Sequence, residues 1–325
     1  MREAAFVKQN KDKWLRFESV LSNNNSIDPD ELSDLYIEIT DHLSYAKTFY
    51  QNSNTERYLN QIASQAHQKI YKTKKVPKNR LISFFKTEFP LMFYQHQREL
   101  LVSFIVFVLF SIVGAYSAAT DGDFVRSILG DSYVNMTLKN IENNDPMGVY
   151  KKMGEFNMTL GITINNIKVA LMAFGYGIMA GIGTLYIMMS NGIMLGSFQY
   201  FFYEKGLLWE SVRTIWIHGT FEISVIIIAG CSGLVLGNGM LFTGTYTRVE
   251  AFTRGVVNGL KILISTIPFF IVAGFLEGYV TRHTEMPDWL AILIIGGSLS
   301  IIIFYYVIYP RQLYRKSQLK KKLSN

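Results

Sequence analysis

Cysteine is nearly absent from this sequence of 325 residues, because Cys231 is the only one and it lies inside an apolar run. A single cysteine excludes a disulfide framework within the chain and a zinc site built on cysteine ligands. The apolar core of a cleavable signal peptide is also missing, since charged residues are spread through positions 1–21. We therefore expect the N-terminal part to remain in the cytoplasm.

Motifs that carry catalysis are absent as well. The sequence has no phosphate-binding glycine loop, no nicotinamide fingerprint, no HExxH metalloprotease motif and no nucleophile elbow. We therefore expect a protein that is not an enzyme and that has no cofactor and no bound metal. The net charge of +7 does not indicate nucleic acid as a partner, because most of the excess lies in a C-terminal tail without acidic residues.

Apolar residues, in contrast, are abundant. They make up 49% of the chain, and the mean hydropathy of +0.17 exceeds what a soluble core needs. Residues 1–99 are polar and charged, whereas long apolar runs alternate with short polar loops from Leu100 onward. This pattern predicts an all-α, polytopic membrane protein of the cytoplasmic (inner) membrane, with an N-terminal helical arm in the cytoplasm.

The polar part divides into two segments. Apolar residues at helical spacing predict a small helical bundle over residues 1–80. Residues 81–99 follow a basic cluster and carry an aromatic stripe, which predicts an interfacial amphipathic helix; a solvated charge run before an ordinary helix is the alternative. A second basic group lies in the tail, residues 311–325. The basic residues expected at the membrane surface are Lys72, Lys74, Lys75, Lys78, Arg80, Lys320, Lys321 and Lys322.

A transmembrane helical domain is predicted over residues 100–310, with a long outer loop at 120–166. The expected spans cover residues 100–119, 169–190, 191–209, 215–236, 256–280 and 289–309. The third of these apolar runs is short, so it predicts either a re-entrant segment or a crossing. If the basic arm and the basic tail both face the cytoplasm, the number of crossings is even, which favours six crossings over five.

Glycines recur at four-residue spacing within these spans. The pairs are Gly177 and Gly181, Gly192 and Gly196, Gly233 and Gly237, Gly255 and Gly259, and Gly274 and Gly278. Small residues at this spacing allow two helices to approach closely in lipid. We therefore expect tight packing within the helical bundle.

Acidic residues are rare in the apolar helices, where only Glu222 and Glu277 occur. A carboxylate at membrane depth must be neutralised, paired or hydrated. His218 lies four residues before Glu222, so both side chains share one helical face. The pattern predicts either a polar cluster that pins neighbouring helices or part of an ion or proton path. The expected intramembrane polar cluster comprises His218, Gly219, Glu222, Asn165, Asn166, Asn191 and Glu277.

Short matches along nearly the full chain point to one family. In the arm they are Phe6-Val7, Trp14, Glu18, Glu31-Leu32, Leu35-Tyr36, Asp41-His42-Leu43, Tyr58-Leu59-Asn60, Ala66-His67 and Tyr71. In the membrane part they are Asn165-Asn166, Asn191, and His218-Gly219 with Glu222. With these residues the chain resembles the stage II sporulation protein M family of bacterial and archaeal membrane proteins. The His-Gly-x-x-Glu run is the most specific of the matches.

The resemblance implies a membrane component without assigned catalysis, which in spore-forming bacteria acts as a scaffold for peptidoglycan-remodelling partners during engulfment. The long arm is similar to a broader branch outside sporulation, so the sporulation role itself stays open. Two function classes follow. One is a non-catalytic scaffold or assembly partner for membrane or cytoplasmic proteins; the other is a small-solute or ion transporter that uses His218, Glu222 and Glu277. We expect the scaffold, with membrane lipid as a partner and with homo-oligomers compatible with the sequence.

Overall fold

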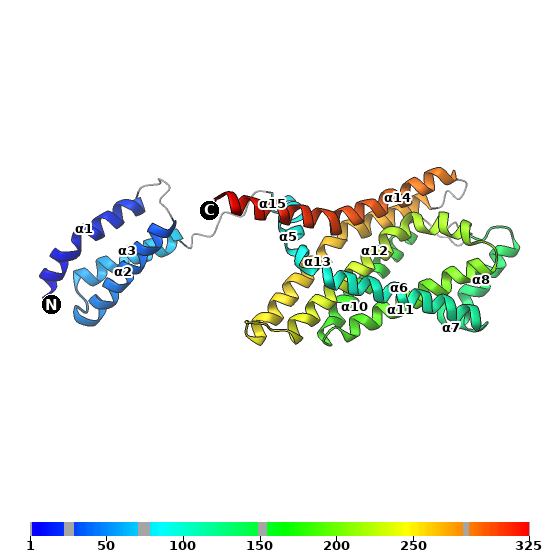
Figure 1. Cartoon of the computed structure of the whole chain (residues 1–325), viewed down its shortest axis with the longest axis horizontal. Helices are drawn as coiled ribbons and strands as arrows, with labels where there is room; N and C mark the ends of the chain where they lie inside the picture. Colours follow the sequence, from blue (N-terminus) through cyan, green and yellow to red (C-terminus); the bar gives the residue numbers. More distant parts are fainter. Residues whose placement is uncertain (1, 23–28, 71–78, 149–154, 282–285, 325) are drawn as a thin grey trace. The chain divides into compact units, whose positions relative to one another are not determined.

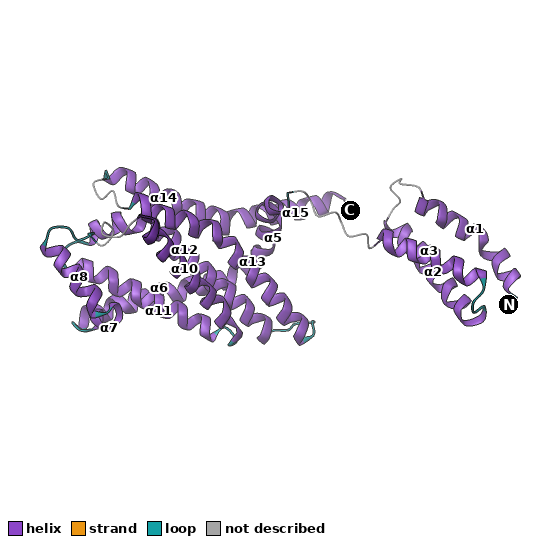
Figure 2. Cartoon of the chain, turned by 180° about the vertical axis from the view of Figure 1, so that it is seen from behind, coloured by secondary structure: helices purple, strands orange, loops and turns teal. Residues whose placement is uncertain are grey.

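The computed structural model describes residues 2–22, 29–70, 79–148, 155–281 and 286–324. These residues form helices and turns, with no strand among them (Figure 1). Figure 2 shows the same helical content from the opposite side. The chain divides into two compact units, Met1–Arg80 and Leu81–Asn325. The all-α fold class predicted from the sequence is confirmed, and the division falls where the arm was predicted to end.

The first unit is a bundle of three helices, α1 (Glu3–Ser22), α2 (Pro29–Phe49) and α3 (Asn54–Ile70). Each helix turns its apolar stripe inward, as its 3.6-residue spacing predicts. The buried core of the bundle consists of Phe6, Trp14, Phe17, Ile39, Ala46, Leu59, Ile62, Ala63 and Ala66.

One hydrogen bond in this bundle fixes the protonation of a histidine. The Trp14 indole donates from Nε1 to Nδ1 of His42 over 3.1 Å. An indole only donates, so His42 Nδ1 must carry a lone pair. Burial lowers the pKa of His42 below its usual value of 6.5, which agrees with a neutral imidazole in the folded arm.

The second unit is built from long helices joined by short turns. Its elements are α4 (Arg80–Ser83), the π-helix η1 (Phe84–Glu88), α5 (Phe89–Phe93), the 3-10 helix η2 (Tyr94–His96), α6 (Gln97–Thr120), α7 (Phe124–Leu129), α8 (Asp131–Glu142), α10 (Glu155–Gly175), the 3-10 helix η3 (Tyr176–Ile178), α11 (Ile182–Glu204), α12 (Leu208–Leu241), α13 (Arg248–Phe275), the π-helix η4 (Leu276–Val280), α14 (Asp288–Ile303), the π-helix η5 (Phe304–Ile308) and α15 (Tyr309–Ser324). The central element is α12, which contacts α6, α10, α11, α13 and α14.

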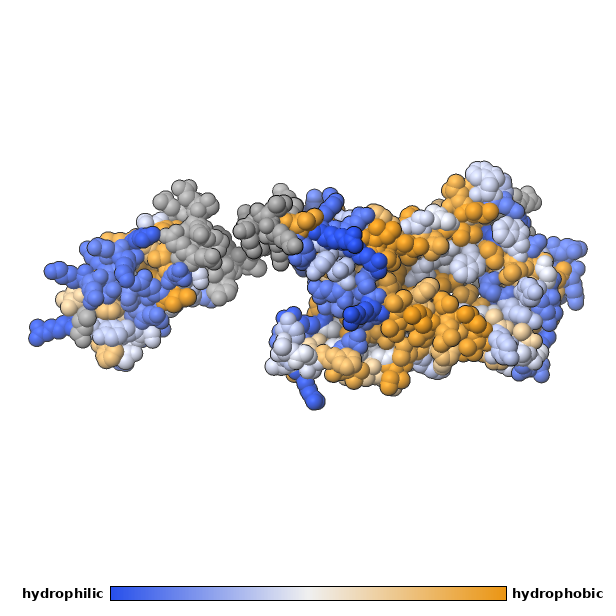
Figure 3. Space-filling model, in the orientation of Figure 1, coloured by the Kyte–Doolittle hydropathy of each residue, from blue (hydrophilic) through white to orange (hydrophobic). Residues whose placement is uncertain are grey.

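Four of the described helical stretches are long and apolar enough to cross a membrane. They are Arg80–Thr120, Leu208–Leu241, Arg248–Val280 and Asp288–Leu319. Figure 3 shows the apolar surface of this unit as a broad zone between two hydrophilic ends. Within these stretches the side chains of Leu109, Ile271 and Leu293 are more than half exposed, as expected for residues that face lipid.

The predicted boundary between the second and third spans is wrong. The chain turns at residues 176–181, where Ala180 and Gly181 have φ angles of 52° and 82°. The predicted boundary at 190/191 lies inside α11. Ser190 and Asn191 do not end the helix, because their side chains donate to the carbonyls of Tyr186 and Ile187 one turn earlier. Since α10 and α11 are not among the four candidate spans, the number of crossings stays a prediction.

Two further segments differ from the sequence-based expectation. The predicted outer loop, 120–166, contains the helices α7 and α8 and the start of α10. The predicted interfacial helix, 81–99, runs on into α6, and part of its aromatic stripe is internal. Phe89 and Phe93 are fully buried and pack their rings edge-on against Tyr306. The exposed large apolar side chains of the segment are those of Leu81 and Ile82, at its start.

The glycine spacing corresponds to close contacts between helices. On α11, a Cβ added at Gly192 would lie 2.6 Å from the carbonyl oxygen of Phe107 on α6, and one added at Gly196 would overlap that of Ser111. On α12, a Cβ at Gly237 would lie 2.5 Å from the backbone nitrogen of Gly181. These helices touch backbone to backbone, which only glycine permits at such positions.

Candidate functional site

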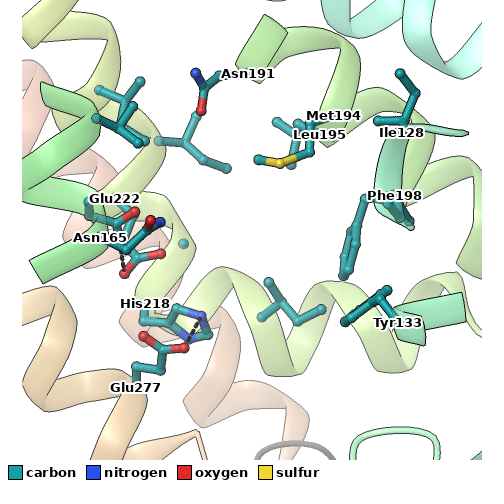
Figure 4. A pocket seen from close by; sticks show the side chains of 17 residues that line it. Ile128, Tyr133, Asn165, Asn191, Met194, Leu195, Phe198, His218, Glu222 and Glu277 are labelled. Carbon is teal, nitrogen blue, oxygen red and sulfur yellow. Dashed lines mark hydrogen bonds and ion pairs between the residues drawn. The ribbon is translucent and has the colours of Figure 1, made fainter. Parts of the chain in front are cut away.

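A cavity of about 410 Å³ lies beside the first half of α12 and is partly open to the surface of the unit. It is lined by Ile128, Leu129, Tyr133, Asn165, Asn166, Val169, Asn191, Met194, Leu195, Phe198, Ile215, His218, Gly219, Glu222, Ile223, Ile226 and Glu277. All seven members of the intramembrane polar cluster expected from the sequence are among these residues. Figure 4 shows Glu222, His218 and Glu277 grouped on one side of the cavity, with Phe198 and Tyr133 across from them.

Three ionisable side chains meet on the polar side of this cavity. The Nε2 atom of His218 lies 3.7 Å from Oε1 of Glu277. One ligand atom from each of His218, Glu222 and Glu277 falls within 4.8 Å of the other two. His218 and Glu277 are buried, with 3% and 2% of their surfaces exposed, while Glu222 is half-buried and lines the open part. We call these three residues the acidic triad.

A threonine sets the tautomer of His218. The Thr281 hydroxyl donates to the carbonyl of Leu276 at 3.2 Å and lies 2.9 Å from Nδ1 of His218. A hydroxyl has one proton, so toward His218 it accepts, and Nδ1 carries the hydrogen. The Nε2 atom of His218 is then the one directed at the carboxylate of Glu277. The π-helix η4 contains Glu277, and Thr281 follows it directly. The end of the α13–η4 helix therefore supplies both a carboxylate of the triad and the residue that orients His218.

The asparagines expected to serve the cluster have different roles. Asn166, on α10, donates from Nδ2 to Oε1 of Glu222 at 2.5 Å. Asn191 donates to a carbonyl of its own helix, and Asn165 is exposed, although both line the cavity. Gly219 also lines it, next to His218. The structure thus brings one asparagine into direct contact with the acidic triad.

The basic residues expected at the membrane surface are mostly outside the described part. Residues 71–78 are not described, and nothing is said of Lys72, Lys74, Lys75 and Lys78. The side chains of Lys320, Lys321 and Lys322 are likewise outside the described set, although their backbone continues α15. Arg80 is exposed at the start of α4.

A second, half-buried polar cluster was not predicted. Nδ1 of His96 lies 3.8 Å from Oε1 of Glu99, and Asn238 donates to the same oxygen at 2.9 Å. Asn258 lies 3.4 Å from Nε2 of His96. Sequence reasoning assigned Glu99 to the interfacial segment 81–99, because the first apolar run begins at Leu100. A sequence signal was present in the position of Glu99, which directly precedes the apolar run that begins at Leu100. In the structure Glu99 is the third residue of α6.

The expectation that no metal could bind depended on local spacing, which offers only His218 and Glu222. The fold adds Glu277 from a distant segment, so a set of one imidazole and two carboxylates forms a group that could hold a metal ion. One buried and one half-buried carboxylate beside an imidazole can hold a proton, bind a cation or hydrogen-bond a polar solute. The side chains of the site are therefore suited to holding a cation, a proton or a polar solute.

Comparison with known proteins assigns the membrane unit. A family model described as "Stage II sporulation protein M" matches residues 103–282, more than half of the chain. The chain belongs to the stage II sporulation protein M family. The matched range contains the whole acidic triad together with Asn166 and Thr281, whereas His96 and Glu99 lie before it. For this member of the sporulation protein M family, the resemblance inferred from the sequence is confirmed.

The arm matches a separate model. A domain of unknown function covers residues 4–72, so the two compact units correspond to two family matches. An uncharacterized protein of Methanocaldococcus jannaschii is 25% identical over 193 residues, which cover 58% of this chain and 83% of that protein. No solved structure matches the chain.

Proposed function

We propose that this sporulation protein M family member is a multi-pass protein of the cytoplasmic membrane that binds a small polar solute or ion in its cavity and moves it across the bilayer. The observation that carries the proposal is the cavity itself. His218, Glu222 and Glu277 line a partly open space of about 410 Å³. That volume is within the range of pockets that hold small ligands.

Ionisable residues in membrane helices support the same proposal. They are costly in lipid, and they commonly mark ion or substrate pathways. A cluster that only pinned helices together would pair all its polar atoms, yet Oε2 of Glu277 is buried without a hydrogen-bond partner. Such an atom fits a site that receives something from the cavity better than it fits a closed structural bond.

A scaffold is the second candidate function, and the arm favours it. The arm has its own core and its own family match, so it has the features of a module that recruits a protein partner. The two functions make different demands on the cavity. A transporter must expose it to both sides of the membrane in turn, whereas a scaffold need not.

The single buried cysteine makes this difference measurable. We would replace Cys231 by Ser and introduce Met194→Cys, which places a thiol on the cavity wall. The protein would be reconstituted in liposomes and treated with a membrane-impermeant thiol reagent added outside or loaded inside. Transport predicts labelling of Met194→Cys from both sides. A thiol labelled from one side only, or from neither, would leave the scaffold as the better account.

Two matched positions calibrate the labelling. Leu293→Cys lies on the apolar exposed surface and should stay unlabelled by a charged reagent from either side. Asp123→Cys lies on an exposed turn between α6 and α7 and should react from one side only. The side at which Asp123→Cys reacts also tests the predicted orientation, in which that turn is outside and the N-terminus is cytoplasmic.

A further inference from the structure

We infer that the acidic triad is a binding site for a divalent first-row transition-metal cation. The inference rests on the proposed function, because it names the class of solute that the cavity would take. Its basis is the meeting of one imidazole nitrogen and two carboxylates on a cavity wall.

The charge balance of the cavity favours a cation. Glu222 and Glu277 both line it, and among the described residues that line it none is Lys or Arg. His218 is the one group there that could become cationic. Two carboxylates facing a low-dielectric space repel each other unless a positive charge or a proton is added. A dication would neutralise both carboxylates together.

The orientation of His218 favours a metal over a proton. Because Thr281 accepts from Nδ1, the Nε2 atom that faces Glu277 offers its lone pair when the imidazole is neutral. The separation of 3.7 Å between Nε2 and Oε1 is too long for a hydrogen bond. Two ligands of one tetrahedral cation, at bonds of about 2.1 Å, lie about 3.4 Å apart. The His218–Glu277 pair is already near that spacing.

The remaining ligands lie around the same point. Glu222 is held at Oε1 by Asn166, which leaves its second oxygen for the metal. Oε2 of Glu277 has no hydrogen-bond partner although it is buried. A histidine whose other ring nitrogen donates to a fixed acceptor is the arrangement that metal sites use to orient an imidazole. Three protein ligands beside a cavity also leave a coordination position open for exchange.

The ligand set selects the class of cation. Calcium and magnesium prefer oxygen ligands only, whereas an imidazole combined with carboxylates suits cations such as manganese, iron, cobalt and zinc. A site with three ligands and an open position binds reversibly enough for a transported ion, and it does not need a thiolate. The only cysteine, Cys231, lies elsewhere on α12 and is buried.

Cobalt(II) alone is the probe for the test. Full-length protein in nanodiscs would be titrated with Co²⁺, followed by its visible d–d absorption and by equilibrium dialysis. We expect one Co²⁺ per chain, with a spectrum of nitrogen and oxygen coordination, and at least a tenfold loss of affinity in each of Glu277→Gln, Glu222→Gln and His218→Gln. A large excess of Mg²⁺ or Ca²⁺ should leave the bound Co²⁺ in place.

Two control variants separate the site from general damage. Thr266→Val removes a buried hydroxyl of α13 that does not line the cavity, and Glu99→Gln removes a half-buried carboxylate of the second cluster; both should bind Co²⁺ as the wild type does. The inference is overturned if the wild type binds no stoichiometric Co²⁺, if the triad variants bind as well as the wild type, if both controls lose binding equally, or if Mg²⁺ or Ca²⁺ displaces Co²⁺.

The failure of this inference is distinguishable from the failure of the proposed function. Two-sided labelling of Met194→Cys without Co²⁺ binding would overturn the metal site and leave transport of another solute standing. Stoichiometric Co²⁺ binding with one-sided labelling would support the metal site and overturn transport.

Discussion

Thr281 is the residue that turns His218 toward the carboxylates, although it offers no ligand atom itself. Its hydroxyl links Nδ1 of His218 to the carbonyl of Leu276. Without that acceptor the imidazole loses both its preferred tautomer and its fixed ring orientation. The effect of this residue should therefore appear in affinity rather than in the number of bound ions.

Thr281→Val tests this role with a side chain of similar shape. We expect the Co²⁺ dissociation constant to rise about 10- to 100-fold, as is typical when the outer partner of a ligating histidine is removed. The stoichiometry should remain one per chain in the same dialysis experiment. Thr266→Val is the matched control, because that hydroxyl is buried and bonds only within α13, to Leu263. Equal losses in both variants would contradict a specific role for Thr281.

Single polar residues inside apolar helices could be predicted from the sequence, whereas the residues that contact them in the fold could not. His218 and Glu222 could be placed on one face because helical spacing is local. Glu277 was assigned to the same cluster only because it is an acidic residue of an apolar helix, and Thr281 was not predicted, since no local pattern brings the end of α13 to the first half of α12. Glu99 was missed for a related reason: a charged residue at the boundary of an apolar run gives no sign of whether the fold will bury it.

Helices α6 and α11 pack backbone to backbone, and glycine makes this contact possible. At Gly196, a methyl group would overlap the carbonyl oxygen of Ser111 on the neighbouring helix. Backbone atoms cannot rotate away as a side chain can, so the helices would have to separate.

Gly196→Ala should therefore destabilise the membrane unit by about 1–3 kcal/mol, the usual cost of overpacking. Thermal unfolding in detergent, monitored by far-ultraviolet circular dichroism, gives the comparison. Gly297→Ala on α14 is the matched control, since a Cβ there meets nothing within 4 Å. If the two variants melt at the same temperature, the α6–α11 contact is looser than described.

The arm bundle provides a pH-dependent element. Burial lowers the pKa of His42 in the folded arm, so the folded state binds this proton less readily than the unfolded state. Stability from this group is therefore present above the usual pKa of about 6.5 and is lost as the pH falls below it. Protonation also places a hydrogen on Nδ1, where the Trp14 indole donates.

Limited proteolysis of the full-length protein at pH 7.5 and pH 5 would follow this loss. Cleavage within the arm should be faster at pH 5, after correction for the activity of the protease at each pH. His42→Gln lacks the titrating group, so its cleavage should change much less between the two pH values. An acid effect of the same size in this variant would assign it to other residues.

Span boundaries show why whole elements were only partly predictable. Long apolar runs gave α6, α12, α13 and α14 close to their observed positions, because length and composition suffice for such helices. The turn between α10 and α11 escaped notice because residues 175–181 are apolar and glycine-rich rather than polar. The boundary between spans was placed at Ser190 and Asn191 instead, yet each of these side chains donates to a carbonyl within α11.

At the scale of the whole molecule, the two units divide the candidate roles between them. The acidic triad and every residue that lines the cavity belong to the second unit. The arm has a separate core and a separate family match. A solute-binding role and a recruiting role can therefore be tested apart.

A variant that lacks residues 1–78 tests whether the two units act independently. The shortened protein should bind Co²⁺ with the affinity and stoichiometry of the full chain, because no triad ligand is lost. Any protein partner held by the arm should be lost from affinity purifications of the same variant. A shortened chain that remains folded in nanodiscs but no longer binds Co²⁺ would show that the units are functionally coupled.

The two halves of α12 differ in how closely they are packed. Along the second half, Gly233 and Gly237 meet the backbones of α10 and the turn before α11, whereas the first half borders the cavity. A helix packed closely at one end and bordered by a cavity at the other keeps more contacts if any movement of its neighbours is centred on the closely packed end. A rotation about the glycine-packed end of α12 would change the width of the cavity with few contacts broken. Helices α6 and α11, which touch backbone to backbone, would move together in such a rotation.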